Sequence, residues 1–99
     1  MATKVDENDT IKYVSDAFCS VTGYSKEELL GNKMQMVRHP DLDPITKKEL
    51  MESYSQYKPW AGEVQYLSKN KKTLWVYGNR FPEFDNNNKF LHFMSIFQD

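Results

Sequence analysis

Three segments in the last third of the chain alternate apolar and polar residues over strand lengths. They span residues 63–68, 73–81 and 90–97, and polar turns at 69–72 and 85–88 separate them. Successive side chains of a strand point to opposite faces of a sheet, and short polar turns join antiparallel neighbours. The sequence therefore predicts an antiparallel sheet, which the preceding residues must complete and cover on one face.

The middle of these three strands determines which side chains face the interior. One face carries Trp75, Tyr77, Asn79 and Phe81, and the other carries Leu74, Val76, Gly78 and Arg80. We predict that the aromatic face points inward, so that Leu74 and Val76 lie on the outer surface. The amide of Asn79 then needs hydrogen-bond partners, which a ligand, the backbone or water can supply.

The first half of the chain predicts two short strands and a block of helices. The first strand closes at residues 5–7 and the second spans residues 11–14, where apolar and β-branched residues alternate. Runs of strands interrupted by a helical block indicate an α+β fold with helices on one face of the sheet.

Capping residues give the positions of the helices. Ser15 or Asp16 begins the first, which Gly23 ends, and Ser25 with Glu28 forms a capping box for the second. Residues 34–41 are irregular or a brief helix, because Pro40 restricts the residue before it. A longer helix begins at Asp43-Pro44 and runs to about Tyr57. These elements make one domain of the whole chain, residues 1–99.

Composition excludes several classes of function. The net charge of −1 leaves no basic surface for nucleic acid, and no apolar run of about 18 residues spans a membrane. Cys19 is the one cysteine, which excludes disulfides and favours a reducing, cytoplasmic setting. No nucleophile–base pair, phosphate-cradling glycine loop or cluster of metal ligands is present, so we expect neither an enzyme nor a metal protein.

Two short segments carry the most specific chemistry. Arg38, His39 and Asp41 come just before the long helix, and Trp60 follows its end in a Pro-Trp-Ala-Gly sequence. The Arg and His donors suit a ligand's anionic or carbonyl groups, and an indole stacks on rings. The structural alternatives are a turn held by His39 with an Asp41 helix cap, and a core Trp60 that joins helix to sheet.

The chain resembles a PAS domain at two motifs. Residues 11–18 read Ile-Lys-Tyr-Val-Ser-Asp-Ala-Phe, similar to the family's I-x-Y-x-N-x-A-F. Residues 22–31 read Thr-Gly-Tyr-Ser-Lys-Glu-Glu-Leu-Leu-Gly and match T-G-Y-S-x-E-E-L-x-G at every fixed position. The resemblance implies the PAS fold, a five-stranded antiparallel sheet with helices packed on one face.

A subgroup is indicated as well. Residues 32–41, which end in Met-Val-Arg-His-Pro-Asp, and residues 59–62 resemble the PAS domains of bacterial aerotaxis receptors, which bind FAD and report redox state or oxygen to chemotaxis signalling domains. The resemblance implies a cofactor site rather than a catalytic one. Its residues would be Arg38, His39, Asp41, Trp60, Trp75 and Asn79.

The chain departs from that subgroup where Tyr66 and Leu67 replace polar residues. These two side chains are able to fill the pocket, so a cofactor-free interaction or dimerisation module and a sensor of another small molecule remain alternatives. Haem is not favoured, because residues 53–56 of the long helix hold no His. A blue-light adduct is not favoured either, because no Cys stands near Val37 and Arg38.

The resemblance also implies a larger protein around this domain. We expect an output domain in the same polypeptide and a cytoplasmic location, with the intact receptor either free or membrane-associated. A PAS–PAS homodimer would use the outer face of the sheet, for which Leu74 and Val76 are the expected contacts.

Overall fold

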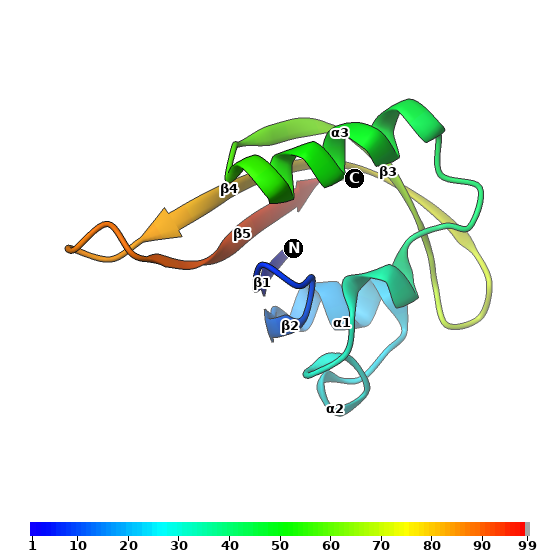
Figure 1. Cartoon of the computed structure of the whole chain (residues 1–99). Coiled ribbons are helices and arrows are strands. Elements are labelled where there is room, and N and C mark those ends of the chain that lie inside the picture. Colours follow the sequence, from blue (N-terminus) through cyan, green and yellow to red (C-terminus); the bar gives the residue numbers. More distant parts are fainter. Residues whose placement is uncertain (99) are drawn as a thin grey trace.

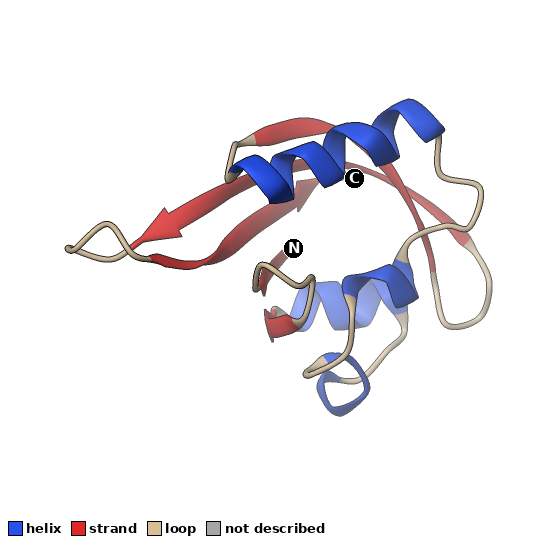
Figure 2. Cartoon of the chain, viewed as in Figure 1, coloured by secondary structure: helices blue, strands red, loops and turns tan. Residues whose placement is uncertain are grey.

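The computed structural model describes residues 1–98, and its helices and strands follow the predicted order (Figures 1 and 2). In chain order they are β1 (Ala2–Val5), β2 (Ile11–Val14), α1 (Asp16–Thr22), α2 (Lys26–Leu29), the 3-10 helix η1 (Met34–Val37), α3 (Pro44–Gln56), β3 (Trp60–Leu67), β4 (Thr73–Phe84) and β5 (Phe90–Gln98).

The strands form one five-stranded sheet in the order β2-β1-β5-β4-β3, and every neighbouring pair is antiparallel. The three long strands make a meander, and β1 adds to it along the free edge of β5. The α+β class and the five-stranded sheet with helices on one face are confirmed. The long strands are longer than predicted, and β1 ends at Val5 rather than continuing to Glu7.

The predicted capping residues end and begin the helices as expected. Ser15 Oγ accepts from the Phe18 amide, and Gly23 ends α1 with a left-handed φ of 81°. Ser25 and Glu28 form the complete capping box of α2. Asp43 caps α3 by accepting from the Thr46 amide, and the helix ends at Tyr57, as predicted.

The assignment of faces in β4 is wrong. Val76, Gly78 and Arg80 are buried under the helices, whereas the side chains of Trp75 and Tyr77 are 61% and 45% exposed on the outer face. Asn79 lies on that exposed face too, and Leu74 is partly buried against the core.

Close packing at Gly78 explains the alternation. A Cβ on Gly78 would come within 3.1 Å of Cδ1 of Phe97, so the missing side chain makes room for this ring on the inner face. Phe97 also packs with Phe18 and Tyr66, at centroid distances of 5.7 and 5.5 Å. These three rings join α1 to β3 and β5 in the centre of the core.

The inner face of β5 contributes Phe93 and Phe97 to this core. Phe93 is fully buried and contacts the ring of Tyr54 at a centroid distance of 4.9 Å, which joins the strand to α3. The β4–β5 hairpin continues past the cover of the helices, as the projecting orange loop in Figure 1 shows.

Two truncations on β5 test the observed alternation. We expect Phe93→Ala to lower the free energy of unfolding by about 3–5 kcal/mol, because it leaves a cavity in a close-packed core. Leu91→Ala, on the same strand but 52% exposed, should change it by less than about 0.5 kcal/mol. Urea unfolding followed by circular dichroism measures both, and similar losses for the two variants would contradict the assignment.

Candidate functional site

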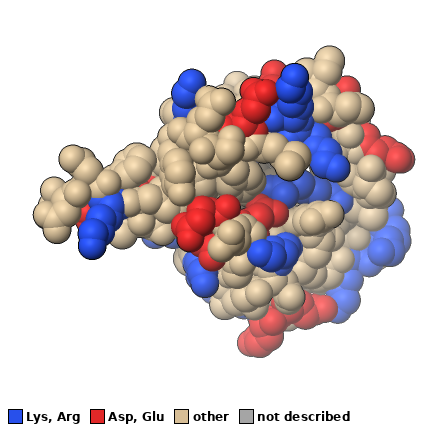
Figure 3. Space-filling view, viewed as in Figure 1, with Lys and Arg blue, Asp and Glu red and all other residues tan. Residues whose placement is uncertain are grey.

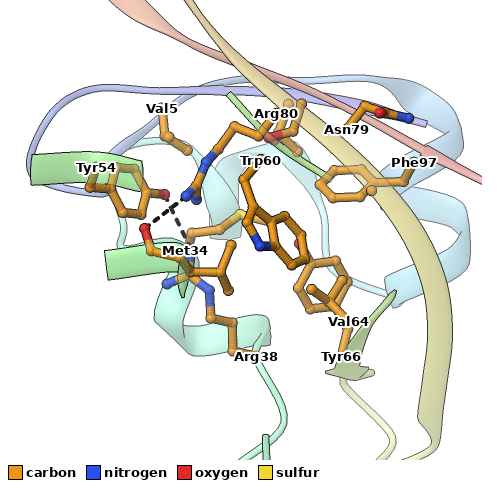
Figure 4. A pocket seen from close by; sticks show the side chains of 14 residues that line it. Val5, Met34, Arg38, Tyr54, Trp60, Val64, Tyr66, Asn79, Arg80 and Phe97 are labelled. Atoms are coloured by element: carbon orange, nitrogen blue, oxygen red, sulfur yellow. Dashed lines mark hydrogen bonds between the residues drawn. The ribbon is translucent and has the colours of Figure 1, made fainter. Parts of the chain in front are cut away.

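A small cluster of buried polar side chains lies in the cleft between α3 and the inner face of the sheet. A cavity of about 20 Å³ lies there, enough for one water molecule. Figure 4 shows the surrounding side chains, which come from both sides of the cleft. Among those that line it are Arg38, Tyr54, Trp60, Tyr66 and Arg80.

Arg38 reaches this cleft from the end of η1. Its backbone forms an isolated antiparallel bridge with Tyr66 of β3, and the next amide, of His39, donates to the Gln65 carbonyl at 3.0 Å. The short segment after η1 is thereby fixed to the edge of the sheet. The Arg38 side chain then points back toward the β1–β2 turn and α3.

The guanidinium of Arg38 grips Asp9 with both arms of its fork. Its Nη1 donates to Oδ2 at 2.7 Å and its Nη2 to Oδ1 at 3.0 Å, and both side chains are about four-fifths buried. Burial is the largest single influence and lowers the pKa of Arg38, but the hydrogen bonds to Asp9 and the electrostatic interactions with Tyr54, Asp9 and Tyr66 together outweigh it and raise the pKa of the guanidinium. The pair ties the β1–β2 turn to η1.

Tyr54 of α3 completes this contact. Its hydroxyl donates to Asp9 in a short hydrogen bond and accepts from Arg38 Nη2 at 3.2 Å. Burial raises the pKa of the Tyr54 hydroxyl. We call Asp9, Arg38 and Tyr54 the clasp, because their side chains join a turn, a 3-10 helix and the long helix.

Arg80 packs over the ring of Tyr54. Its guanidinium carbon is 3.9 Å from the ring centroid, and its Nη2 donates to the Leu50 carbonyl at 2.9 Å. Burial and the neighbouring charge of Arg38 lower the pKa of Arg80. Tyr54 thus contacts both arginines, one through its hydroxyl and one through its ring.

A larger groove opens outside the clasp. It has a volume of about 1130 Å³ and runs between α3 and the segments around residues 7–9 and 35–42. Arg38, Leu50 and Tyr54 line both this groove and the cavity, so they divide the two spaces. On the face drawn in Figure 3, acidic and basic side chains are mixed, and neither sign covers it alone.

The six predicted cofactor residues divide into three groups. Arg38 and His39 line the groove together, and Asp41 lies beside them, with its amide donating to His39 Nδ1 at 3.0 Å. That bond makes the predicted turn, but the helix cap is Asp43 rather than Asp41.

Trp60 lines the cavity and joins helix to sheet. Its indole Nε1 donates to Glu49 of α3 at 3.0 Å, and its ring folds over Gly62, where a Cβ would come within 2.8 Å of Cζ2. This contact is the structural role of the Pro-Trp-Ala-Gly sequence.

Trp75 and Asn79 lie on the exposed face of β4. Asn79 borders the cavity, but Figure 4 shows its side chain directed away from it. A role for these two residues in holding a cofactor stays a prediction. The strand contributes Gly78 and Arg80 to the interior in their place.

Sequence reasoning missed Asp9, Tyr54 and Arg80. The sequence did contain a signal for Arg80, because it is one of only two arginines, with Arg38, among the 13 basic residues. No group of three residues able to hold a metal ion occurs within residues 1–98. Over the same range, no helix is long and apolar enough to cross a membrane.

Comparison with known proteins gives a consistent family. The family model described as PAS fold matches residues 11–97. The aerotaxis receptor of Escherichia coli strain K12 is 32% identical over 82 residues, which cover 83% of this chain and 16% of that protein. Phototropin-2 of Oryza sativa subsp. japonica is 24% identical over 93 residues, which cover 94% of this chain and 10% of that protein.

Solved structures share the fold. The light-state structure of the blue-light photoreceptor Aureochrome1 LOV superimposes with a TM-score of 0.89 at 18% identity, covering 99% of this chain and 79% of that one. The light-state dimer of the fungal photoreceptor Vivid has a TM-score of 0.89 at 21% identity, covering 99% and 76%. The chain spans less than a fifth of either curated relative.

Removing the carboxylate tests the clasp. We expect Asp9→Asn to lower the free energy of unfolding by about 3 kcal/mol, because it leaves the buried Arg38 charge without its partner. Glu7→Gln, an exposed change in the same turn, should cost less than about 0.5 kcal/mol. Denaturant unfolding measures both, and an unchanged stability of Asp9→Asn would show that the clasp does not hold the turn.

The buried phenols give a pH dependence. Burial raises the pKa of Tyr66 and Tyr54 above the ordinary value, so the unfolded chain loses these protons first as pH rises. The free energy of unfolding is therefore expected to fall above pH ~10. In Tyr66→Phe the fall should be shallower by up to about 1.4 kcal/mol per pH unit, and an unchanged slope in alkaline urea titrations would contradict this assignment.

Proposed function

This chain belongs to the PAS family, as the sequence motifs indicated, and on that premise we propose that it is a flavin-binding sensory domain of a larger signalling protein. The relatives support a sensor: one is an aerotaxis receptor, and solved neighbours include blue-light photoreceptors. Another solved neighbour is a light-oxygen-voltage domain whose mechanism was probed with a flavin analogue. We assign the domain to signalling rather than to catalysis.

The observation that carries the proposal is the groove at the clasp. Its volume of about 1130 Å³ is large enough for a nucleotide-sized ligand. Arg38 and His39 line it, and they supply the donors that a flavin's carbonyls and phosphates accept. Lys47 of α3 adds a further cation to the lining of the groove.

The fit differs between the two spaces. The interior cavity of about 20 Å³ is too small for a flavin ring, because Trp60, Tyr66 and Phe97 fill the space around it. The groove outside the clasp has both the volume and the donors. In this proposal the flavin lies against Arg38 and His39 in the groove. The large volume of the groove favours FAD over the smaller FMN.

Bound flavin would supply an electron acceptor whose ring changes charge on reduction. The residues of this chain would respond through Arg38, since its guanidinium already holds Asp9 and Tyr54. A change of charge beside Arg38 alters the balance of the hydrogen bonds in the clasp. The proposed signal is cellular redox state or oxygen, and the proposed receiver is an output domain in the same polypeptide.

A cofactor-free interaction module is the second candidate, and the filled interior favours it. Tyr66 is 5% exposed and packs against Phe18 and Phe97, as predicted for a side chain that closes the pocket. A homodimer of this module would use the outer face of the sheet, where Trp75, Tyr77 and Ile96 are exposed. They take the place of Leu74 and Val76 in the predicted dimer surface.

The visible spectrum of the purified domain decides between the candidates. We expect an oxidised-flavin spectrum, retained on purification or gained by adding FAD, that bleaches with dithionite. Arg38→Gln should weaken FAD binding at least tenfold, which corresponds to about 1.4 kcal/mol, because it removes the charged donor fork. The exposed change Lys48→Gln on α3 is the matched control.

Circular dichroism shows whether Arg38→Gln folds, and His39→Gln tests the same wall of the groove if it does not. A colourless protein that takes up neither FAD nor FMN would overturn the flavin proposal and leave the interaction module. An FAD complex that neither variant weakens would place the flavin away from this groove.

A further inference from the structure

The two arginines of this chain both lie in the cleft near Tyr54. Of the 13 basic residues, all but Arg38 and Arg80 are lysines. The guanidinium carbons of these two arginines are 5.9 and 3.9 Å from the centroid of the Tyr54 ring. Arginine is suited to buried recognition of anions, because its planar fork is always charged and only weakly hydrated.

The two guanidiniums differ in how their charge is balanced. Arg38 has the carboxylate of Asp9. Arg80 is 5% exposed and has no carboxylate partner among residues 1–98, its hydrogen bond being to the Leu50 carbonyl. Its Nε is the one buried side-chain polar atom within that range that lacks a hydrogen-bond partner. Buried charges in proteins are normally paired, so one positive charge in this cleft is left over.

A row of polar side chains leads across the sheet from Arg80. Thr3 of β1 lies opposite Ser95 of β5, and Ser95 lies opposite Arg80 of β4. All three are buried, at 1%, 6% and 5% exposure, in an inner face that is otherwise largely apolar. The row also lines the cavity of about 20 Å³, so hydroxyl groups and a guanidinium border the same small space.

We propose that this cavity is a binding site for one small anion, a halide or a carboxylate head group, held by Arg80 with Ser95 and Thr3. The hydroxyls and guanidinium are hydrogen-bond donors, and an anion accepts from all of them. The volume admits about one water-sized particle, which suits a single ion and excludes a phosphate ester with its substituent. The anion would balance the charge that Arg80 brings into the core.

Two sources supply this chemistry. A free ion would occupy the cavity alone, whereas a dicarboxylate would place one head group there and extend past Leu50 and Tyr54, which line both spaces, toward the groove. The site does not depend on the flavin proposal, because it lies on the inner side of the clasp and its test contains no flavin.

Trp60 reports on the site, because it lines the same cavity. In a Trp75→Phe background, which removes the exposed indole, Trp60 is the single tryptophan. Its fluorescence is titrated with chloride, formate and succinate at constant ionic strength, set with the bulkier anion isethionate. We expect a saturable change with at least one of the three anions and at least tenfold weaker binding in Arg80→Gln. Lys48→Gln, which removes an exposed cation, should leave the dissociation constant unchanged.

The arms of the titration separate the sources. Saturation by chloride or formate at lower concentration than by succinate identifies a free ion, and tighter binding of succinate identifies the head group of a larger acid. If Arg80→Gln does not fold, Ser95→Ala should weaken binding several-fold. A wild-type response that never saturates, or a dissociation constant unchanged in the folded variant, would overturn the proposal and leave the charge of Arg80 facing the Tyr54 and Phe93 rings.

Discussion

The position of α3 over the inner face of the sheet depends on the contacts of Tyr54. The inner face needs a long helix above it, and α3 presents a weakly apolar surface, with Ile45 and Met51 exposed at 69% and 62%. Hydrophobic burial by α3 is therefore modest. Directional contacts supplement it: the Tyr54 ring rests on Phe93 and Arg80, and its hydroxyl binds Asp9. The Trp60–Glu49 hydrogen bond adds a second tie between helix and sheet. The cleft is polar because α3 is attached to the sheet and to the β1–β2 turn through polar side chains.

Most of the fold could be predicted, because local chemistry determines it. The capping box at Ser25 and the glycine at 23 depend only on neighbouring residues, and so do the two polar turns of the sheet. The wrong assignment of inner and outer faces in β4 arose because both faces of this strand carry apolar side chains. A period of two then has no preferred phase, and exchanging the faces moves every side chain of the strand. Gly78 beneath Phe97 and the buried Arg80 set the phase, and both are contacts with distant segments.

The residues of the candidate site also divide into those that local motifs reveal and those that contacts with distant segments determine. Arg38, His39 and Trp60 could be found because short motifs contain them. Asp9 and Tyr54 could not, since they lie 29 and 16 residues from the Arg38 that they bind. Arg80 fell on the outer surface in the prediction because the aromatic face of β4 was expected to point inward. Arg80 is the one basic residue of β4, and nearly all other basic residues of the chain are lysines. An arginine in that position is a usable signal, since burial favours the residue with a weakly hydrated planar charge.

The same geometry determines how the proposed sensor passes on a change of charge. Asp9 lies in the turn that follows β1, and β1 pairs directly with β5, the central strand of the sheet. A new charge beside Arg38 competes with Asp9 for the same donors, so it acts on this turn and on α3 together. Its effect is limited to the difference in its interaction energy between the closed and open clasp. A buried pair makes that difference large compared with an exposed one, because water screens it less. In the proposed sensor, burial of the clasp would let a small ligand bias the sheet, whereas an exposed Arg–Asp pair at the same place would transmit little.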